Sequence, residues 1–394
     1  MDSTILNYYN PATYNLLSKG QPLFSFGISS RISLFRQNDS QEFDVATNFQ
    51  HFAMTFPIKK HFGLTLGVKP FSSKGYDFYS GESVLTDSIV YNYRGSGNLN
   101  EVFGGFSTDL LKLENTRFAV GMNAGYVFGE TKNIRRSYIY SSSSTTFTGG
   151  IDERISHLST FHYDLGFYLN HKFRDHDFTL SGRIDPSQKL KGDFQYNLFF
   201  SSNIDNVNAY DTVSTSTLNS HITSATSYEF GLTYKYLFRD TKENTRKLNS
   251  QLLIAGSYGG TNWNNFSAPL NDSTALLNAS KLTFGLQFTP EVNLMEKIST
   301  LKFYQKIHYR LGGYFYTLPY SYQGTQISDK ALTFGFGIPV PTLRSLSSIN
   351  LGFSIGKRGT NSNSSLNENY YGINLGITIA PGISERWFRN LKLN

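Results

Sequence analysis

The chain contains 394 residues, of which 39% are hydrophobic, 15% aromatic and only 16% charged, and it has a formal net charge of +7 and no cysteine. The lack of cysteine excludes a disulfide framework and thiolate metal sites. No Lys/Arg run marks a nucleic-acid surface, so no nucleic-acid partner is expected, and no stretch approaches the ~18 consecutive apolar residues of a membrane-spanning helix.

This composition favours one class of protein. Abundant aromatic residues, few charges and alternating polarity are typical of a transmembrane β-barrel, whereas the competing interpretation is a soluble β-sandwich or propeller. We therefore expect an all-β fold consisting of a single transmembrane antiparallel β-barrel.

The N-terminal segment precedes any regular pattern. The first twenty residues contain neither a basic n-region nor an apolar h-region, so we expect that a signal peptide has been removed. The stretch "NYYNPATYNLL" (residues 7–17) is nevertheless apolar and aromatic, and a proline interrupts it. Such a segment is too apolar for a flexible leader and too broken for a long helix.

Period-2 alternation dominates residues 23 to 379. In residues 118–129, "FAVGMNAGYVFG", one face carries large apolar side chains and the other carries mostly glycine, alanine and asparagine. A soluble sandwich would place many charged residues on its second face. An apolar face against lipid and a small or polar face against a wet lumen instead indicate a membrane barrel.

The alternation predicts about 14 strands, an even number, as is usual for single-chain bacterial barrels. Many exceed the ~9–11 residues that cross a bilayer, so we expect strands to project beyond the membrane. The expected strands are 23–35, 42–57, 61–77, 88–111, 117–140, 152–173, 177–200, 226–238, 248–263, 276–290, 301–318, 326–340, 348–359 and 367–379.

The connections alternate between two kinds, which predicts periplasmic turns on one side and extracellular loops on the other, with both termini in the periplasm. Pro186 interrupts the seventh strand and cannot donate to a ladder. It predicts either a bulge or a lateral gap in the wall. The shorter connections are 58–61, 174–177, 239–247 and 341–348, and the longer ones are 141–151, 201–225, 264–274, 321–326 and 360–366.

No catalytic motif is present, and the histidines have no metal-ligand spacing, so neither an enzyme nor a cofactor is expected. The notable charges are cations with inward parity, which either join a salt-bridge network with inward carboxylates such as Asp164 and Glu229 or form a basic lumen that attracts anions. These cations are Arg31, Lys69, Arg183, Lys235, Lys302, Lys306, Arg310 and Arg358.

The N-terminal "NYYNPATY" resembles the Asn-Pro-Ala signature near the mature N-terminus of the FadL family, outer-membrane transporters of long-chain fatty acids and other hydrophobic compounds. The run from residue 349 to 394, with "GKRGT" at 356–360, Glu368 and "WF" at 387–388, resembles Bacteroidota outer-membrane proteins allied to that family. The resemblance implies a 14-stranded barrel in which the N-terminal segment folds inward as a hatch. The implied hatch residues are Tyr8, Tyr9, Asn10, Pro11, Ala12 and Tyr14, and Leu16 and Leu17 are expected to bury with the tyrosines against the lumen wall.

Three parts of the chain follow from this interpretation: a plug (residues 1–20), a barrel (21–382) and a basic periplasmic tail (383–394). The resemblance also implies ligands that bind in the lumen and leave through a wall gap, for which Pro186 is the candidate. The expected function is passive uptake of hydrophobic or amphipathic small molecules. The alternative is a non-transporting barrel within an outer-membrane secretion or assembly complex, so the expected partners are outer-membrane lipid or lipopolysaccharide, a hydrophobic ligand and other outer-membrane proteins.

Overall fold

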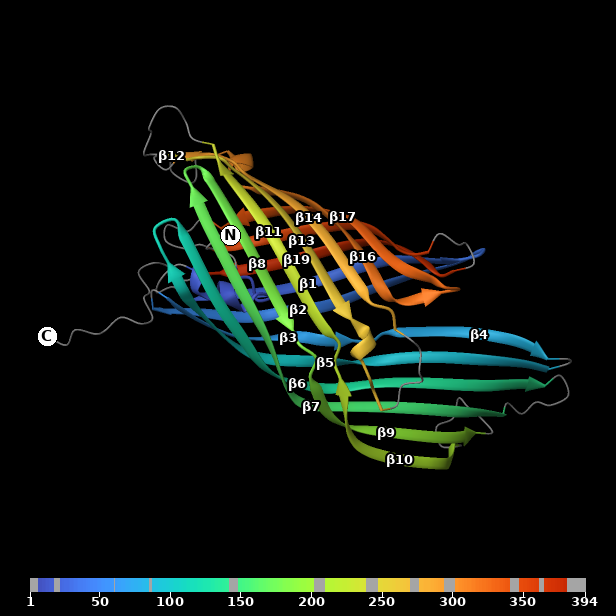
Figure 1. Ribbon diagram of the computed structural model, residues 1–394. Coiled ribbons are helices and arrows are strands. Elements are labelled where there is room, and N and C mark those ends of the chain that lie inside the picture. The colour runs from blue at the N-terminus through green and yellow to red at the C-terminus, as the bar shows by residue number, and fades with distance from the viewer. Residues whose placement is uncertain are drawn as a thin grey trace.

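The computed structural model describes residues 6–17, 22–59, 61–84, 87–141, 148–201, 210–238, 247–269, 276–293, 302–340, 347–360 and 365–380. Figure 1 shows one curved antiparallel sheet closed into a barrel. The closure is made by β1 and β19, where Phe24 lies opposite Ile379 and Arg36 opposite Asn367. In the described residues no helix is long and apolar enough to cross a membrane.

The wall strands are β1 (Leu23–Gln37), β2 (Ser40–Lys59), β3 (Phe62–Ser73), β4 (Tyr76–Val84), β5 (Asp87–Lys112), β6 (Thr116–Ser141), β7 (Thr148–Phe173), β8 (His176–Asp185), β9 (Lys189–Ser201), β10 (Tyr210–Thr223), β11 (Thr226–Leu237), β13 (Gln251–Asn262), β14 (Ala279–Thr289), β16 (His308–Tyr322), β17 (Thr325–Pro339), β18 (Ser348–Gly359) and β19 (Asn367–Ile379). The short elements are η1 (Pro11–Leu16), η3 (Trp263–Asn265), η4 (Phe303–Gln305), β12 (Lys247–Leu248) and β15 (Val292–Asn293).

Three wall strands are each broken in two. β3 and β4 pair with successive parts of β5, β8 and β9 with successive parts of β7, and β11 and β10 with β8 and β9. Counted as single strands, these pairs give a closed 14-strand antiparallel barrel, so the predicted fold class and strand number are confirmed.

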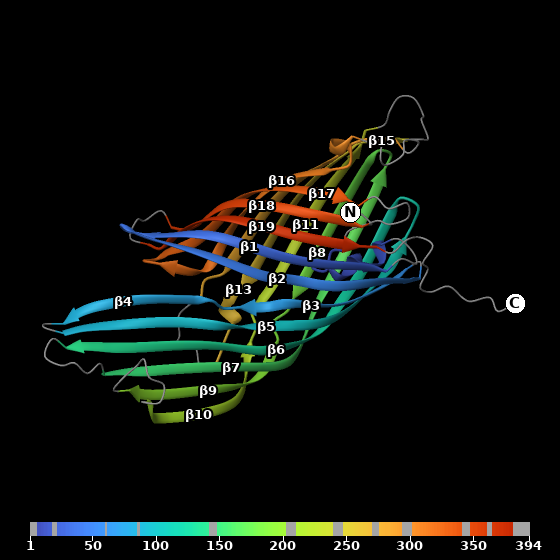
Figure 2. The same cartoon turned by 180° about the vertical axis from the view of Figure 1, so that it is seen from behind.

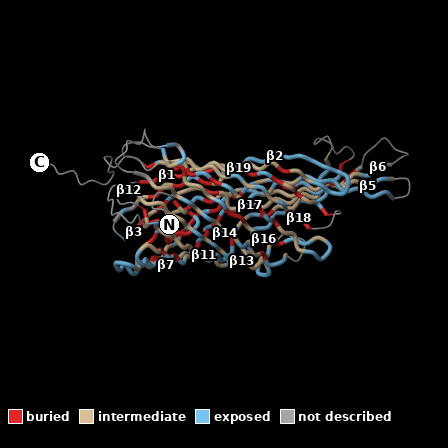
Figure 3. The backbone as a smooth tube through the Cα atoms, turned by 90° about the horizontal axis from the view of Figure 1, so that it is seen from above, coloured by how far each residue is buried: buried red, intermediate tan, exposed pale blue. Residues whose placement is uncertain are grey.

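The two faces of the wall follow the predicted alternation. On β6 the outward Met122, Tyr126 and Phe128 are at least 40% exposed, whereas the inward Ala119 and Asn123 are fully buried. The same division runs around the barrel, and Figure 3 shows buried and exposed positions alternating along the strands. The outward band is the apolar surface that a transmembrane barrel presents to lipid.

Several predicted boundaries are wrong. The expected 201–225 loop contains β10, which continues β11 past a break at Ser224. The expected 321–326 loop is a two-residue turn, with Gln323 (φ 48°) and Gly324 (φ 77°) both left-handed. The strand expected from residue 301 begins at His308, after η4. In β10, seven of the 14 residues are Ser or Thr, and their weak apolar contrast hides the period of two.

We call the end of the barrel that holds η1 the plug end, and the opposite end the far end. Near the plug end the wall is continuous. Towards the far end, β2 leaves β3 beyond the Phe52–Val68 pair and continues with β1. β10 pairs along its length with β9, and on its other side the described residues form a single bridge, Thr223 to Ser267.

The far end therefore consists of two separate sheets, which diverge in Figures 1 and 2. One contains β4, β5, β6, β7, β9 and β10, and the other runs from β13 through β19 to β1 and β2. We call the first sheet the arm. Unpaired strand edges do not occur within hydrocarbon, so the separation of the arm agrees with strands that project beyond the membrane. The predicted basic tail (383–394) lies outside the described residues.

Candidate functional site

The N-terminal segment forms a short 3-10 helix inside the barrel. The Asn10 side chain caps η1 by accepting a hydrogen bond from the Ala12 N–H (3.1 Å), and Pro11 occupies the first helical position, where no N–H donor is needed. The other end of the Asn10 amide donates to the Phe167 carbonyl of β7 (3.1 Å). The Asn-Pro-Ala step is therefore a helix cap and a wall anchor in one.

Most of the hatch residues expected to be buried are buried. Ala12 and Tyr14 are 0% exposed, and Tyr8 and Leu17 are below 10%. Leu16 is half-buried, and Tyr9 is 57% exposed, so the burial of Tyr9 was wrongly predicted. Consecutive residues of a turn face different directions, so Tyr8 stacks on His51 (ring centroids 4.1 Å apart) while Tyr9 turns outward.

Glycines on the inward face of the wall make the groove in which η1 lies. A Cβ on Gly121 would stand 2.4 Å from the Pro11 carbonyl carbon, and one on Gly63 would stand 2.4 Å from that of Tyr14. A Cβ on Gly166 would stand 2.2 Å from the Asn10 side-chain oxygen. The plug backbone therefore lies against glycines of β3 and β6, and its Asn10 and Pro11 side chains lie against a glycine of β7, where a Cβ would collide with them.

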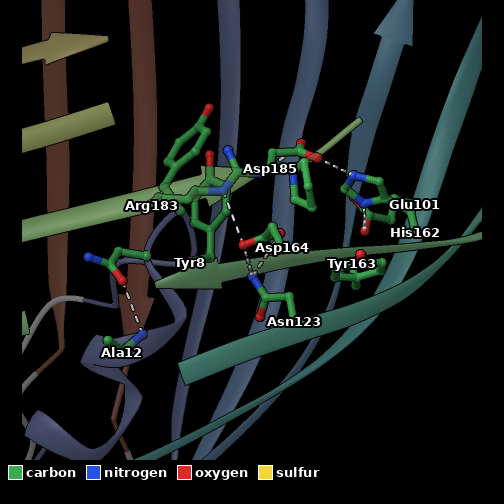
Figure 4. Close-up of polar contacts among 12 residues, drawn as sticks. Tyr8, Ala12, Glu101, Asn123, His162, Tyr163, Asp164, Arg183 and Asp185 are labelled. Carbon is green, nitrogen blue, oxygen red and sulfur yellow. Dashed lines mark hydrogen bonds and ion pairs between the residues drawn. The ribbon is translucent and has the colours of Figure 1, made fainter. Parts of the chain in front are cut away.

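A chain of polar contacts starts at the plug and enters the wall. The Tyr14 hydroxyl donates to the Asn123 side-chain oxygen (2.9 Å). The Asn123 amide donates in turn to Asp164 (3.2 Å), as Figure 4 shows. Burial raises the pKa of the Tyr14 phenol well above its usual range, which keeps it a hydrogen-bond donor. Asp164 is fully buried and accepts from the Arg183 guanidinium (3.1 Å).

The chain of contacts continues across β8, β7, β5 and β3. Arg183 also pairs with Asp185 (3.5 Å), and His162 lies between Asp185 and Glu101, with each ring nitrogen 3.0 Å from a carboxylate oxygen. Lys69 pairs with Glu101 (3.3 Å). Because an ionised carboxylate only accepts hydrogen bonds, a doubly protonated imidazole suits this geometry. Three cations then balance three carboxylates.

A second anchor holds the other end of the plug. The Asn15 amide donates to Asp109 (2.8 Å) and to the His61 carbonyl, and the Arg117 guanidinium donates to both Asp109 and the Asn15 carbonyl. The Asp109 side chain is 1% exposed and binds both Asn15 and Arg117 near the C-terminal end of β5. The plug is thus fixed at both ends of η1 by buried polar contacts.

A third group of charges lies away from the plug. Arg358 pairs with Asp329 (2.9 Å) and Glu368 (3.3 Å), and Arg31 pairs with Glu368 (3.6 Å). Arg31 also lies over the Tyr370 ring, 4.1 Å from its centroid. Two cations balance two carboxylates here, so this part of the lumen resembles the salt-bridge network, not the anion-attracting basic lumen.

The remaining predicted cations fall in different places. Arg310 donates to the side-chain oxygens of Gln287 (2.9 Å) and Asn350 (2.8 Å). Lys235 is half-buried near the plug end, opposite Asp177 in the ladder. Lys302 and Lys306 flank η4 before β16 begins, so their inward parity on a strand was wrongly predicted.

A lumen cavity of about 320 Å³ lies on the far side of Arg183 from the plug. Its lining includes Glu229 and Lys281, the glycines of β13 and the Tyr316 ring. The Lys281 ammonium lies 5.5 Å from the centroid of the Tyr314 ring. The cavity combines an aromatic wall with one carboxylate and two cations, which suits a small amphipathic molecule.

The break at Pro186 is closed by side chains. The Gln188 amide donates to the Tyr163 carbonyl (2.8 Å) and its oxygen accepts from the Tyr163 N–H (3.0 Å), so it replaces the missing ladder bonds of β7. Ser187 and Gln188 are joined in the same way to Ser224, at the matching break between β10 and β11. Pro186 thus marks a break that hydrogen bonds bridge.

The network residues Asn123, Asp185, Glu101 and His162 were not predicted as a site. His162 and its partner Glu101 are 61 residues apart in the sequence. Only the strand order places β5 and β7 on either side of β6, close enough for the two inward side chains to meet across it. Among the described residues no group of three His, Asp or Glu side chains is arranged to hold a metal ion.

The comparisons with known proteins agree on the fold. The chain is similar to the P. putida toluene transporter TodX (12% identity, TM-score 0.52, 95% of this chain and 92% of that chain covered). It is also similar to a TodX deltaS2S3 mutant described as a monoaromatic hydrocarbon channel (13%, 0.54, 95% and 93%) and to a Pseudomonas aeruginosa FadL homologue (12%, 0.50, 95% and 93%).

No curated protein sequence matches the chain. The BamG family model matches residues 1–394, its entire length. The chain, a barrel of the FadL type whose Asn-Pro-Ala plug lies in a glycine groove, therefore belongs to the BamG family.

Proposed function

We propose that the protein is an outer-membrane channel for passive uptake of hydrophobic or amphipathic small molecules, with both termini in the periplasm and the plug as its gate. The observation that carries this proposal is the connection of the plug to the lumen cavity through one shared side chain. Arg183 connects the two, because it lines the cavity and also pairs with Asp164, the last link to Tyr14.

The chemistry of the cavity supports the ligand class. Lys281 and Arg183 supply positive charge for a carboxylate, while Tyr316 supplies an aromatic surface. Two of the similar solved barrels are described as a toluene transporter and as a monoaromatic hydrocarbon channel, which supports an apolar ligand body. Since the lumen network is charge-balanced, selectivity would come from the cavity and not from a basic lumen as a whole.

Transfer of a fluorescent long-chain fatty acid into liposomes tests this function. The full-length protein should raise the transfer rate above that of empty liposomes, and deletion of residues 2–18 should raise it further because the plug is removed. Equal rates for empty and protein-containing liposomes would overturn the proposal. A matched control, Gly285→Val, alters an inward glycine far from the plug, where a Cβ would meet nothing closer than 3.9 Å.

The edge of the arm favours a second candidate, a barrel subunit of an outer-membrane complex. Residues 211–219 of β10 are exposed, and on the side away from β9 they pair with no described strand, so this edge offers backbone groups to which another chain could add a strand. Purification from native membranes in mild detergent separates the candidates. A channel comes out alone, whereas a complex subunit comes out with stoichiometric partners that are lost when Thr217→Pro blocks the edge.

A further inference from the structure

A row of basic residues lies on the outward face of the barrel, near the far end of the second sheet. Lys330 on β17 is directly opposite Lys357 on β18, and Lys357 is opposite Asn369 on β19. Arg36 of β1 lies one step further towards the far end. All three cations are exposed, and all have the parity of the lipid-facing side chains.

These outward cations differ from their inward neighbours. Arg358 and Arg31 meet Asp329 and Glu368 across the lumen face, as described above. Within the described residues, Lys330, Lys357 and Arg36 make no ion pair. Like charges directly opposite each other on one face of a sheet repel. An anion bound between Lys330 and Lys357 would therefore relieve the repulsion between their ammonium groups.

Directly below the cations, towards the plug end, the same strands carry apolar side chains. The next outward row towards the plug end lies two positions along each strand and consists of Leu332, Ile355 and Tyr371. Each is more than 50% exposed. The cations thus lie nearer the far end and the apolar side chains nearer the plug end. This matches the order of headgroup and acyl chain in a lipid leaflet.

The two rows line one groove of about 650 Å³. Phe284 of β14 and Leu34 of β1 extend its apolar wall, and all three cations belong to its lining. Its volume falls in the range of roughly 300–1,000 Å³ that is typical of small-molecule sites. A flat, featureless barrel surface would have no such hollow.

We propose that this groove binds a phosphorylated, multiply acylated glycolipid of the outer leaflet. The Lys330 and Lys357 ammonium groups and the Arg36 guanidinium hold a phosphate, for which fixed cations of both kinds are suited. One acyl chain lies along Leu332, Ile355 and Tyr371. Assignment to the outer leaflet rests on the proposed orientation, with the far end outside, whereas the binding itself is independent of transport.

Titration of lipid A into the full-length protein in detergent, followed by native mass spectrometry, tests the site. The variant with Lys330→Gln and Lys357→Gln should bind at least about tenfold more weakly, since two charge-assisted contacts are lost. Lys330→Arg with Lys357→Arg should retain binding. The matched control, Lys189→Gln with Lys191→Gln, removes two exposed lysines of β9 outside the groove and should leave the affinity unchanged.

Two further lipids identify the occupant. Lipid A from which the phosphates have been removed should bind to the unmodified protein no better than intact lipid A binds to the double Gln variant. Phosphatidylglycerol should bind to the unmodified protein more weakly than lipid A does. Equal binding of dephosphorylated lipid A, equal binding of phosphatidylglycerol, or unchanged lipid A affinity in the double variant would each overturn the proposal. If the double variant does not fold, Arg36→Gln alone replaces it, with a severalfold loss expected.

Discussion

The plug end and the far end of the same barrel are built on opposite principles. At the plug end the lumen is filled, because wall glycines leave room for η1. The buried carboxylates there, Asp164 and Asp109, are paired with arginines. At the far end the wall divides into two sheets, and the outward Lys330, Lys357 and Arg36 make no ion pair with the described residues. The comparison shows that one continuous strand pattern supports a half whose lumen is filled by the plug and a half whose wall is divided into two sheets.

The largest expected contrast concerns the buried charges. Arg183→Met should lower the free energy of unfolding by about 3–5 kcal/mol, because Asp164 is left buried without its cation. Arg31→Met at the far end should cost about 1 kcal/mol or less, since Glu368 keeps Arg358 as a partner. Urea unfolding in detergent micelles measures both. Equal losses would show that the two networks do not differ.

The glycine groove gives the next contrast. Gly121→Val should displace the plug, since overpacking costs about 1–3 kcal/mol and η1 gives way more easily than a ladder strand. Gly285→Val, on the same inward face but away from the plug, should leave η1 in place. Limited proteolysis of the N-terminal segment measures the displacement. Cleavage of both variants at the same rate would contradict the groove.

A smaller effect is expected at the helix cap. Asn10→Ala removes the cap of η1 and the bond to the Phe167 carbonyl, with a cost of about 0.5–2 kcal/mol. Tyr9→Ala, at the exposed neighbouring position, should be close to neutral. Hydrogen exchange at the Ala12 amide reports the difference, and protection that survives in the Asn10 variant would exclude the cap.

The smallest effect is expected at the break in the wall. Gln188→Ala removes the two side-chain bonds to Tyr163, each worth about 0.5–1.5 kcal/mol. Exchange of the Tyr163 amide should accelerate while that of Leu165, which lies in the intact β7–β8 ladder, should not. Equal acceleration of both amides would mean that the whole β7–β8 ladder opens.

The strand pattern could be predicted from the sequence because alternation is local. The outward Met122 and the inward Asn123 follow from parity alone. The pairing of His162 with Glu101 could not be predicted, because it depends on which strands flank β6. β10 was missed because serine and threonine make up much of it and offer no contrast between its faces.

The Asn-Pro-Ala step shows what a resemblance adds and what it lacks. It indicated an inward-folded segment, but not that Asn10 both caps η1 and bonds to β7. Likewise, inward parity selected Arg31 and Arg358 without revealing that the carboxylates facing them balance their charge. The outward lysines were overlooked because an exposed lysine in a strand looks the same as any solvated one.

A reversible lock on the plug tests the central claim most directly. Ala12 and Ala119 pack in one buried cluster, and the chain has no other cysteine, so Ala12→Cys with Ala119→Cys allows one specific disulfide. Fatty-acid transfer into liposomes should stop when this pair is oxidised and return to the unmodified rate on reduction. A transfer rate that is the same in the oxidised and reduced states would contradict the assignment of the plug as the gate.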